Sequence, residues 1–162
     1  MPEKILHINI PFFLSSVESL CNSSLRDRAL IFVSSDSPFS AVLDISETAY
    51  KAGIRCGMTV AEARKTERNL ILIRPEKNKY SSALNKIKSL LCRFTPLCEI
   101  LPSGEAYLDI RGTARMFGTA EDFAMKTFRE IYAQTGLRSH IGIGSSKLIS
   151  RAASSFFTSD IL

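Results

Sequence analysis

A turn near the middle of the chain is flanked by two strand-like runs. Residues 98–101 are mostly apolar, residues 102–104 read Pro-Ser-Gly, and residues 105–110 alternate between polar and apolar side chains. In a strand this alternation places Ala106, Leu108 and Ile110 on one face and the polar set on the other. The pattern predicts a β-hairpin in which Glu105 directly follows the turn.

Short apolar runs and helical spacing predict the remaining elements. Strands are expected over residues 4–10, 29–33, 41–45, 70–73 and 139–143. Helices are expected over residues 12–20, 46–52, from 59 onward, and over 77–94, 119–132 and 147–156. Thr59 with Glu62 forms a capping-box pattern. Residues 112–118 are predicted as a connection, and the helix that follows is predicted to turn Ala124, Phe128 and Ile131 inward.

The order of these elements predicts an α+β fold. From residue 77 on, the order is helix, strand, strand, helix, strand, helix, and the first strand joins them. We expect a small mixed sheet with helices on one face. Residues 15–76 predict an inserted α/β subdomain, so the main domain combines residues 1–14 and 77–162.

The composition suits a chain with a sizeable core. Of its 162 residues, 45% are hydrophobic and 23% charged, which fits one compact domain or a domain with an insertion. No apolar run is long enough to cross a membrane, and the N-terminus lacks a signal-peptide pattern. The four cysteines form no CxxC pair, so we favour free, buried thiols in a reducing cytoplasm over disulfides or zinc ligands.

Positive charge is concentrated in one stretch. Eleven Lys or Arg and three acids lie between residues 51 and 93, within a chain of net charge +5. This excess suits a polyanion such as DNA, contacted non-specifically through Lys51 and Arg55, or equally an ordinary solvated face. Lys147 and Arg151, one helical turn apart, are further candidates for contact with a phosphate backbone; simple solvent exposure is the alternative.

Glu105 is the natural candidate for a metal ligand, but its setting argues against one. Metal-assisted phosphoryl transfer needs several carboxylates that converge on the ion. Here Gly104 and Ser103 precede Glu105, so we interpret it as a solvated or hydrogen-bonded strand acid rather than a metal ligand. Asp109 is interpreted as structural, and both His7 and His140 as packed side chains rather than ligands. No metal or other cofactor is expected.

Six motifs, in order along nearly the whole chain, resemble those of Y-family (translesion) DNA polymerases of the UmuC/DinB type. Residues 7–18 read HINIPFFLSSVE and resemble the family's HIDMDAFFASVE. Residues 102–109, PSGEAYLD, resemble SLDEAFLD. The other four matches are LILIRP at 70–75 followed by Tyr80, RFTP at 93–96, GTARMFG at 112–118 and GIGSSKL at 142–148. The resemblance implies a polymerase palm with inserted fingers; the thumb and the C-terminal DNA-gripping domain have no counterpart here.

The departures from the family pattern fall on its functional positions. The resemblance assigns the three metal-binding acids to Asn9, Gly104 and Glu105, of which one is still acidic. The nucleotide clamp falls on Glu47 and Tyr50. The aromatic residue that excludes ribonucleotides falls on Leu14, whereas the phosphate-binding lysine is retained as Lys147.

The metal-binding, nucleotide-clamping and ribonucleotide-excluding positions have all changed. In this the chain resembles the catalytically inactive ImuB-type relatives. We therefore expect a non-catalytic protein of DNA repair and the SOS response that binds DNA or protein. An active translesion polymerase or a sliding clamp is a candidate partner through regions beyond this sequence. Two alternatives stay open: an active nucleotidyl transferase with a rearranged Mg²⁺ site, and a pure protein-interaction scaffold.

Overall fold

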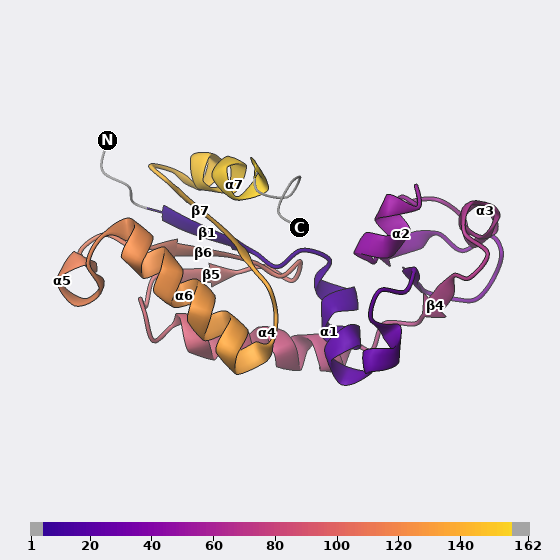
Figure 1. The fold of residues 1–162 in the computed structure, drawn as a ribbon, viewed down its shortest axis with the longest axis horizontal. Coiled ribbons are helices and arrows are strands. Elements are labelled where there is room, and N and C mark those ends of the chain that lie inside the picture. The colour runs from indigo at the N-terminus through magenta and orange to yellow at the C-terminus, as the bar shows by residue number, and fades with distance from the viewer. Residues whose placement is uncertain (1–4, 157–162) are drawn as a thin grey trace. The chain divides into compact units, whose positions relative to one another are not determined.

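The computed structural model describes residues 5–156 and divides the chain into two compact units. The larger unit combines the chain up to Pro11 with the chain from Ser81 onward, and the inserted unit is Phe12–Tyr80. Figure 1 shows their helices and strands. Each unit contains its own sheet, and the predicted α+β class is confirmed.

The sheet of the larger unit has four strands in the order β5-β6-β1-β7. They are β5 (Cys98–Ile100), β6 (Glu105–Asp109), β1 (Ile5–Asn9) and β7 (His140–Gly144). The predicted hairpin is β5 and β6. All three pairings are antiparallel, so the expectation of a mixed sheet here is wrong. Strand order cannot be read from hydrophobic pattern alone, because β1 pairs with strands far away in the sequence.

The register of β1 separates two faces of this sheet. Leu6 lies opposite Leu108 and Ile8 opposite Ala106, and all four side chains are buried. The other face carries the pairs His7–Tyr107 and Asn9–Glu105. Both faces of β1 are largely covered, and the strand lies between β6 and β7 in the interior of the unit.

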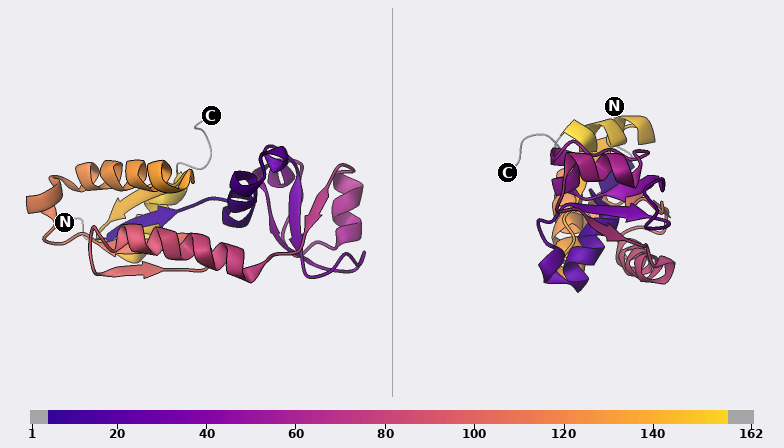
Figure 2. Two further views of the ribbon diagram at one scale, coloured as in Figure 1. Left: turned by 90° about the horizontal axis from the view of Figure 1, so that it is seen from below. Right: turned by 90° about the vertical axis from the view of Figure 1, so that its right-hand side faces the viewer.

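Helices cover both faces of the sheet, rather than one face as predicted. α4 (Lys77–Leu91) and α6 (Ala120–Thr135) lie on one side and α7 (Lys147–Phe156) on the other (Figure 2). α7 packs against β7 and β1 so closely that a Cβ on Gly142 would lie 2.1 Å from the Ser150 carbonyl oxygen. Glycine on this strand is therefore what lets the helix reach the sheet.

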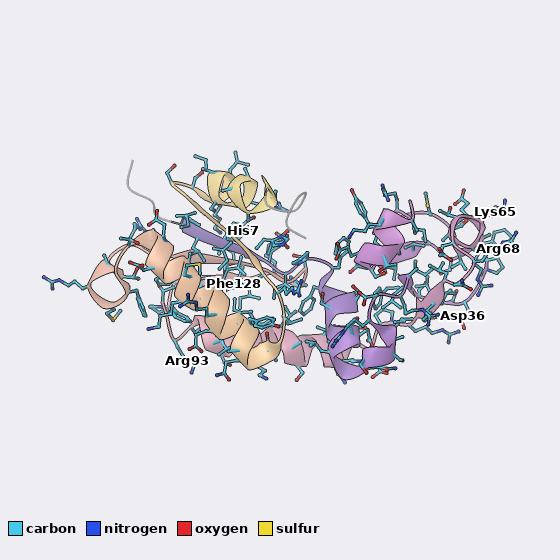
Figure 3. The ribbon with its side chains drawn as sticks, in the orientation of Figure 1. His7, Asp36, Lys65, Arg68, Arg93 and Phe128 are labelled. Carbon is cyan, nitrogen blue, oxygen red and sulfur yellow. The ribbon has the colours of Figure 1, made fainter. Side chains whose placement is uncertain are left out.

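Two further details of the larger unit differ from the expectation. Residues 112–118 contain a one-turn helix, α5 (Ala114–Phe117), too short to produce a helical hydrophobic pattern. On α6 the buried residues are Phe123, Thr127 and Ile131, whereas Phe128 is 37% exposed (Figure 3). The Thr127 hydroxyl donates to the Phe123 carbonyl at 2.8 Å, which allows a polar residue to occupy the buried stripe.

The inserted unit has a three-stranded mixed sheet in the order β3-β2-β4. β2 (Leu30–Val33) pairs antiparallel with β3 (Val42–Ile45) and parallel with β4 (Ile71–Ile73). Its helices are α1 (Phe13–Cys21), the 3₁₀ turn η1 (Ser23–Leu25), α2 (Glu47–Lys51) and α3 (Val60–Thr66). Ser46 caps α2 and, as predicted, Thr59 forms a capping box with Glu62.

Most of the cysteines lie nearer the surface than expected. All four thiols are free, as expected, but Cys21, Cys56 and Cys92 are exposed rather than buried. Burial and the neighbouring Cys92 raise the pKa of the Cys98 thiol to about 11. Among the described residues, no helix is long and apolar enough to cross a membrane.

Candidate functional site

The three positions assigned to metal-binding acids lie together at one end of the larger sheet. Asn9 on β1 pairs directly with Glu105 on β6 and with His140 on β7. Gly104 ends the hairpin turn with φ +86° and accepts a hydrogen bond from the Ile10 amide at 3.2 Å. A side chain at Gly104 would be strained by about 1 kcal/mol in this left-handed conformation. Gly104 therefore contributes a backbone carbonyl, but no side chain, to this end of the sheet.

The carboxylate of Glu105 is bound by an arginine of the same unit. Arg151 on α7 donates from Nη2 to Oε1 of Glu105 at 3.0 Å. The Glu105 side chain is 16% exposed, and its second oxygen lies 3.8 Å from Nε2 of His7. That distance exceeds hydrogen-bond length, so Arg151 is the partner that offsets the negative charge.

His7 lies beneath α7 and is almost completely buried (Figure 3). Its Nδ1 is 2.7 Å from the Ser154 hydroxyl, and its ring lies 4.6 Å from that of Tyr107. Burial lowers the pKa of His7; Glu105 opposes this shift and Arg151 adds to it. Burial therefore favours the neutral imidazole, consistent with a packed side chain.

These donors do not fit a divalent metal ion. The Asn9 amide brings no charge, Gly104 brings no side chain, and Glu105 is already paired with Arg151. Magnesium sites rely on carboxylates together with substrate oxygens. Within residues 5–156 no group of three or more His, Cys, Asp or Glu side chains is arranged to hold a metal.

Lys147 lies at the start of α7, where sequence reasoning expected it to meet phosphate. Its ammonium group pairs with the carboxylate of Glu99 on β5 and lies 5.1 Å from the centroid of the Tyr107 ring. Both side chains of this pair are about half exposed, so the interaction is weak in water and open to exchange. Its role as a DNA contact stays a prediction.

The positions assigned to the nucleotide clamp gather on α2 in the inserted unit. Glu47 pairs with Lys51 at 2.7 Å across one helical turn. Tyr50 is exposed, and the guanidinium of Arg55 lies 4.1 Å from its ring centroid. Leu14 is half-buried on α1. An acid paired with a lysine is a poor receptor for a triphosphate, because the Glu47 carboxylate would repel it.

Sequence reasoning missed one buried polar cluster in the inserted unit. Glu18 on α1 is 7% exposed; its two oxygens accept from Lys79 Nζ at 2.6 Å and from the Tyr80 hydroxyl at 2.5 Å. Burial, then the hydrogen bond to Glu18, raises the pKa of Tyr80 well above its usual range. Glu18 and Tyr80 both occur in the quoted motifs, but only tertiary structure shows that they meet.

The chain resembles known proteins in both sequence and fold. The impB/mucB/samB family model matches residues 8–155. DNA polymerase IV of Desulfatibacillum aliphaticivorans is 30% identical over 150 residues, which cover 93% of this chain and 38% of that protein. DNA polymerase IV of Halorhodospira halophila is 32% identical over 151 residues, 93% of this chain and 42% of that protein. The chain thus spans well under half of these relatives.

Two solved structures share the fold. DinB from Sulfolobus solfataricus has a TM-score of 0.85 at 22% identity, covering 94% of this chain and 45% of that chain. A Y-family DNA polymerase chimera has a TM-score of 0.86 at 21% identity, with coverage of 94% and 46%. At this identity the likeness concerns the fold alone. Taken with the family match over residues 8–155, it means that the chain belongs to the impB/mucB/samB family and corresponds to the palm-and-fingers region of Y-family DNA polymerases.

Proposed function

We propose that this chain belongs to a polymerase-like protein that does not transfer nucleotides and that acts in DNA repair and translesion synthesis by binding DNA or protein. The observation that carries the proposal is the 3.0 Å pairing of Glu105 with Arg151, opposite Asn9 and beside Gly104. Metal-assisted transfer depends on carboxylates that neutralise the metal and the developing phosphate charge. Here the single remaining acid is neutralised from within the protein.

The nucleotide positions support the same conclusion. Glu47 replaces a residue that the family resemblance assigns to triphosphate binding, and its pairing with Lys51 leaves no surplus positive charge between them. Leu14 cannot offer the flat ring of an aromatic residue against a sugar. Substrate binding and metal binding would therefore both be impaired, which distinguishes this pattern from a single inactivating change.

The proposal extends to domain roles and partners. We assign residues 1–14 and 77–162 to a palm-like domain and residues 15–76 to a fingers-like domain. DNA binding is supported by the basic excess between residues 51 and 93 and by fold likeness to Dbh DNA polymerase, whose post-insertion binary complex has a TM-score of 0.84. An active polymerase or a sliding clamp is the proposed protein partner.

A primer-extension assay with Mg²⁺ or Mn²⁺ tests the absence of catalysis. We expect no extension by the wild type or by Glu105→Ala. The matched control is Glu99→Ala, which removes an exposed strand acid of the same sheet. Nucleotide incorporation that is lost in Glu105→Ala and kept in Glu99→Ala would establish the rearranged active site instead.

A scaffold without DNA affinity is the second candidate. One face of α6 exposes Met125, Phe128 and Tyr132, which follow one another at helical spacing. Exposed apolar side chains gathered on one face are typical of protein contacts. Fluorescence anisotropy with a primer–template at low and high salt separates the candidates, because DNA binding should appear at low salt and weaken steeply as salt rises. Absence of binding at low salt favours the scaffold.

A further inference from the structure

The inserted unit exposes an aromatic ring that is stacked with an arginine. Tyr50 on α2 is 48% exposed, and the guanidinium carbon of Arg55 lies 4.1 Å from its ring centroid. The ring of Phe12 is 6.0 Å away, tilted by 50°. These are the distances of a cation–π pair with a neighbouring aromatic contact. We call Tyr50, Arg55 and Phe12 the stacking platform.

The guanidinium of the platform is held in place by the backbone. Nη1 of Arg55 donates to the carbonyl oxygens of Tyr50 at 2.8 Å and of Ile54 at 2.7 Å. An arginine has five N–H donors, so these bonds fix its plane while leaving others available. Within residues 5–156 Arg55 forms no ion pair with a carboxylate. Its charge is therefore available to an incoming anion.

The surroundings of the platform favour a polyanion over a cation. The nearest acid on α2, Glu47, is already paired with Lys51 at 2.7 Å. Arg55 then contributes an unbalanced positive charge beside the exposed ring. Phe12 holds a left-handed backbone conformation, φ +49°, which a bulky residue adopts only where its surroundings fix it. The platform is thus both charged and preorganised.

We propose that the stacking platform binds one base of single-stranded DNA, with Arg55 contacting the adjacent phosphate. A flat ring beside a planar guanidinium is the surface on which unpaired bases stack, with little dependence on their identity. The inference rests on the proposed function, since it names a surface through which a non-catalytic family member would hold DNA. A proline- or aromatic-rich peptide is the competing ligand, and absence of strand binding at low salt would favour it.

Binding is measured by fluorescence anisotropy of a short, mixed-sequence, fluorescein-labelled single strand with the full chain at low salt. Tyr50→Ala should weaken binding about tenfold, whereas Tyr50→Phe, which keeps the ring, should bind as the wild type does. Arg55→Lys keeps the charge but loses the planar stack, and should weaken binding several-fold. Phe39→Ala removes another exposed aromatic ring of the inserted unit and should change nothing.

An abasic strand with the same number of phosphates isolates the stacking step. The wild type should bind it as weakly as Tyr50→Ala binds the normal strand. Because the chain has four tyrosines and no tryptophan, quenching of tyrosine emission gives a second readout that Tyr50→Phe should reduce. Equal affinity of the wild type and Tyr50→Ala, equal affinity for normal and abasic strands, or no binding at low salt would overturn the proposal.

The two proposals fail separately. If Tyr50→Ala binds single strands as well as the wild type does, the primer-extension result still stands. The chain would then remain non-catalytic and bind through another surface. Nucleotide incorporation would overturn the non-catalytic function without altering the dependence of single-strand affinity on Tyr50.

Discussion

Glu18 and Glu105 are both shielded carboxylates with internal cationic partners, yet they differ in how they are enclosed. Glu18 lies in the inserted unit with Lys79 at 2.6 Å and the Tyr80 hydroxyl at 2.5 Å. Glu105 lies on the sheet of the larger unit with Arg151 at 3.0 Å and His7 beyond hydrogen-bond distance. One carboxylate is satisfied at both oxygens and the other at one.

The cationic partners differ as well. Lys79 is 29% exposed, whereas Arg151 is 57% exposed and can exchange its carboxylate for water. Charge pairs removed from water cost several kcal/mol to break, and exposed pairs contribute about 1 kcal/mol or less. Glu18 is therefore a firmly held structural acid of the inserted unit, whereas Glu105 takes part in a weaker pair whose cation is more exposed.

The largest expected effect comes from breaking the Glu18 cluster. Glu18→Ala leaves the Lys79 ammonium and the Tyr80 hydroxyl without their acceptor and should lower the free energy of unfolding by about 3 kcal/mol. Urea denaturation of the variant measures the loss. Tyr80→Phe, which removes one hydrogen bond and keeps the ring, should cost about 1 kcal/mol. A loss below 1 kcal/mol in Glu18→Ala would mean that the cluster is readily hydrated.

A smaller effect is expected at the sheet. Arg151→Gln removes the cation beside Glu105 and should lower the free energy of unfolding by about 1 kcal/mol or less, because the pair is half open to solvent. Arg129→Gln, on an exposed position of α6, is the matched control in the same urea experiment. If Arg151→Gln cost as much as Glu18→Ala, the distinction between the two carboxylates would fail.

The smallest expected effect is a loss of stability in mild acid, caused by protonation of His7. Burial lowers the pKa of His7 below its ordinary 6.5, so the unfolded chain binds this proton at a higher pH than the folded chain. The free energy of unfolding should then fall as the pH drops below 6.5 and be unaffected well above it. His7→Gln should flatten this dependence, measured by thermal unfolding across that range. Arg129→Gln, at an exposed position of α6, supplies the control, and an identical slope in both variants would contradict the assignment.

Much of the local structure could be predicted from the sequence because local signals specify it. The hairpin around residues 102–104, the capping box at Thr59 and the helix over 147–156 all occur as predicted. The buried stripe of α6 could not be predicted, because Thr127 is buried through a bond to its own helix while Phe128 faces solvent. An apolar pattern cannot register a polar residue that supplies its own partner.

The sequence could predict which residues lie at the candidate site, but not which of them bind one another. The family motifs pointed to Asn9, Gly104 and Glu105, and β1 and β6 do place Asn9 opposite Glu105. Nothing in the sequence indicates that Arg151, 46 residues further along the chain, binds Glu105. Such pairings depend on how α7 packs on the sheet, which is a tertiary property. The same limit explains why the Glu18 cluster and the stacking platform emerged only from the structure.

The close packing of α7 on β7 has a consequence for which substitutions this face can tolerate. At Gly142 and Gly144 a Cβ would meet backbone atoms of α7 at 2.1 Å and 2.6 Å, distances that no rotamer change can relieve. Even an alanine would have to displace the helix, and with it both Arg151 and Ser154. The residues least free to change here are thus two glycines, which have no side chain with which to form a charge pair or a hydrogen bond.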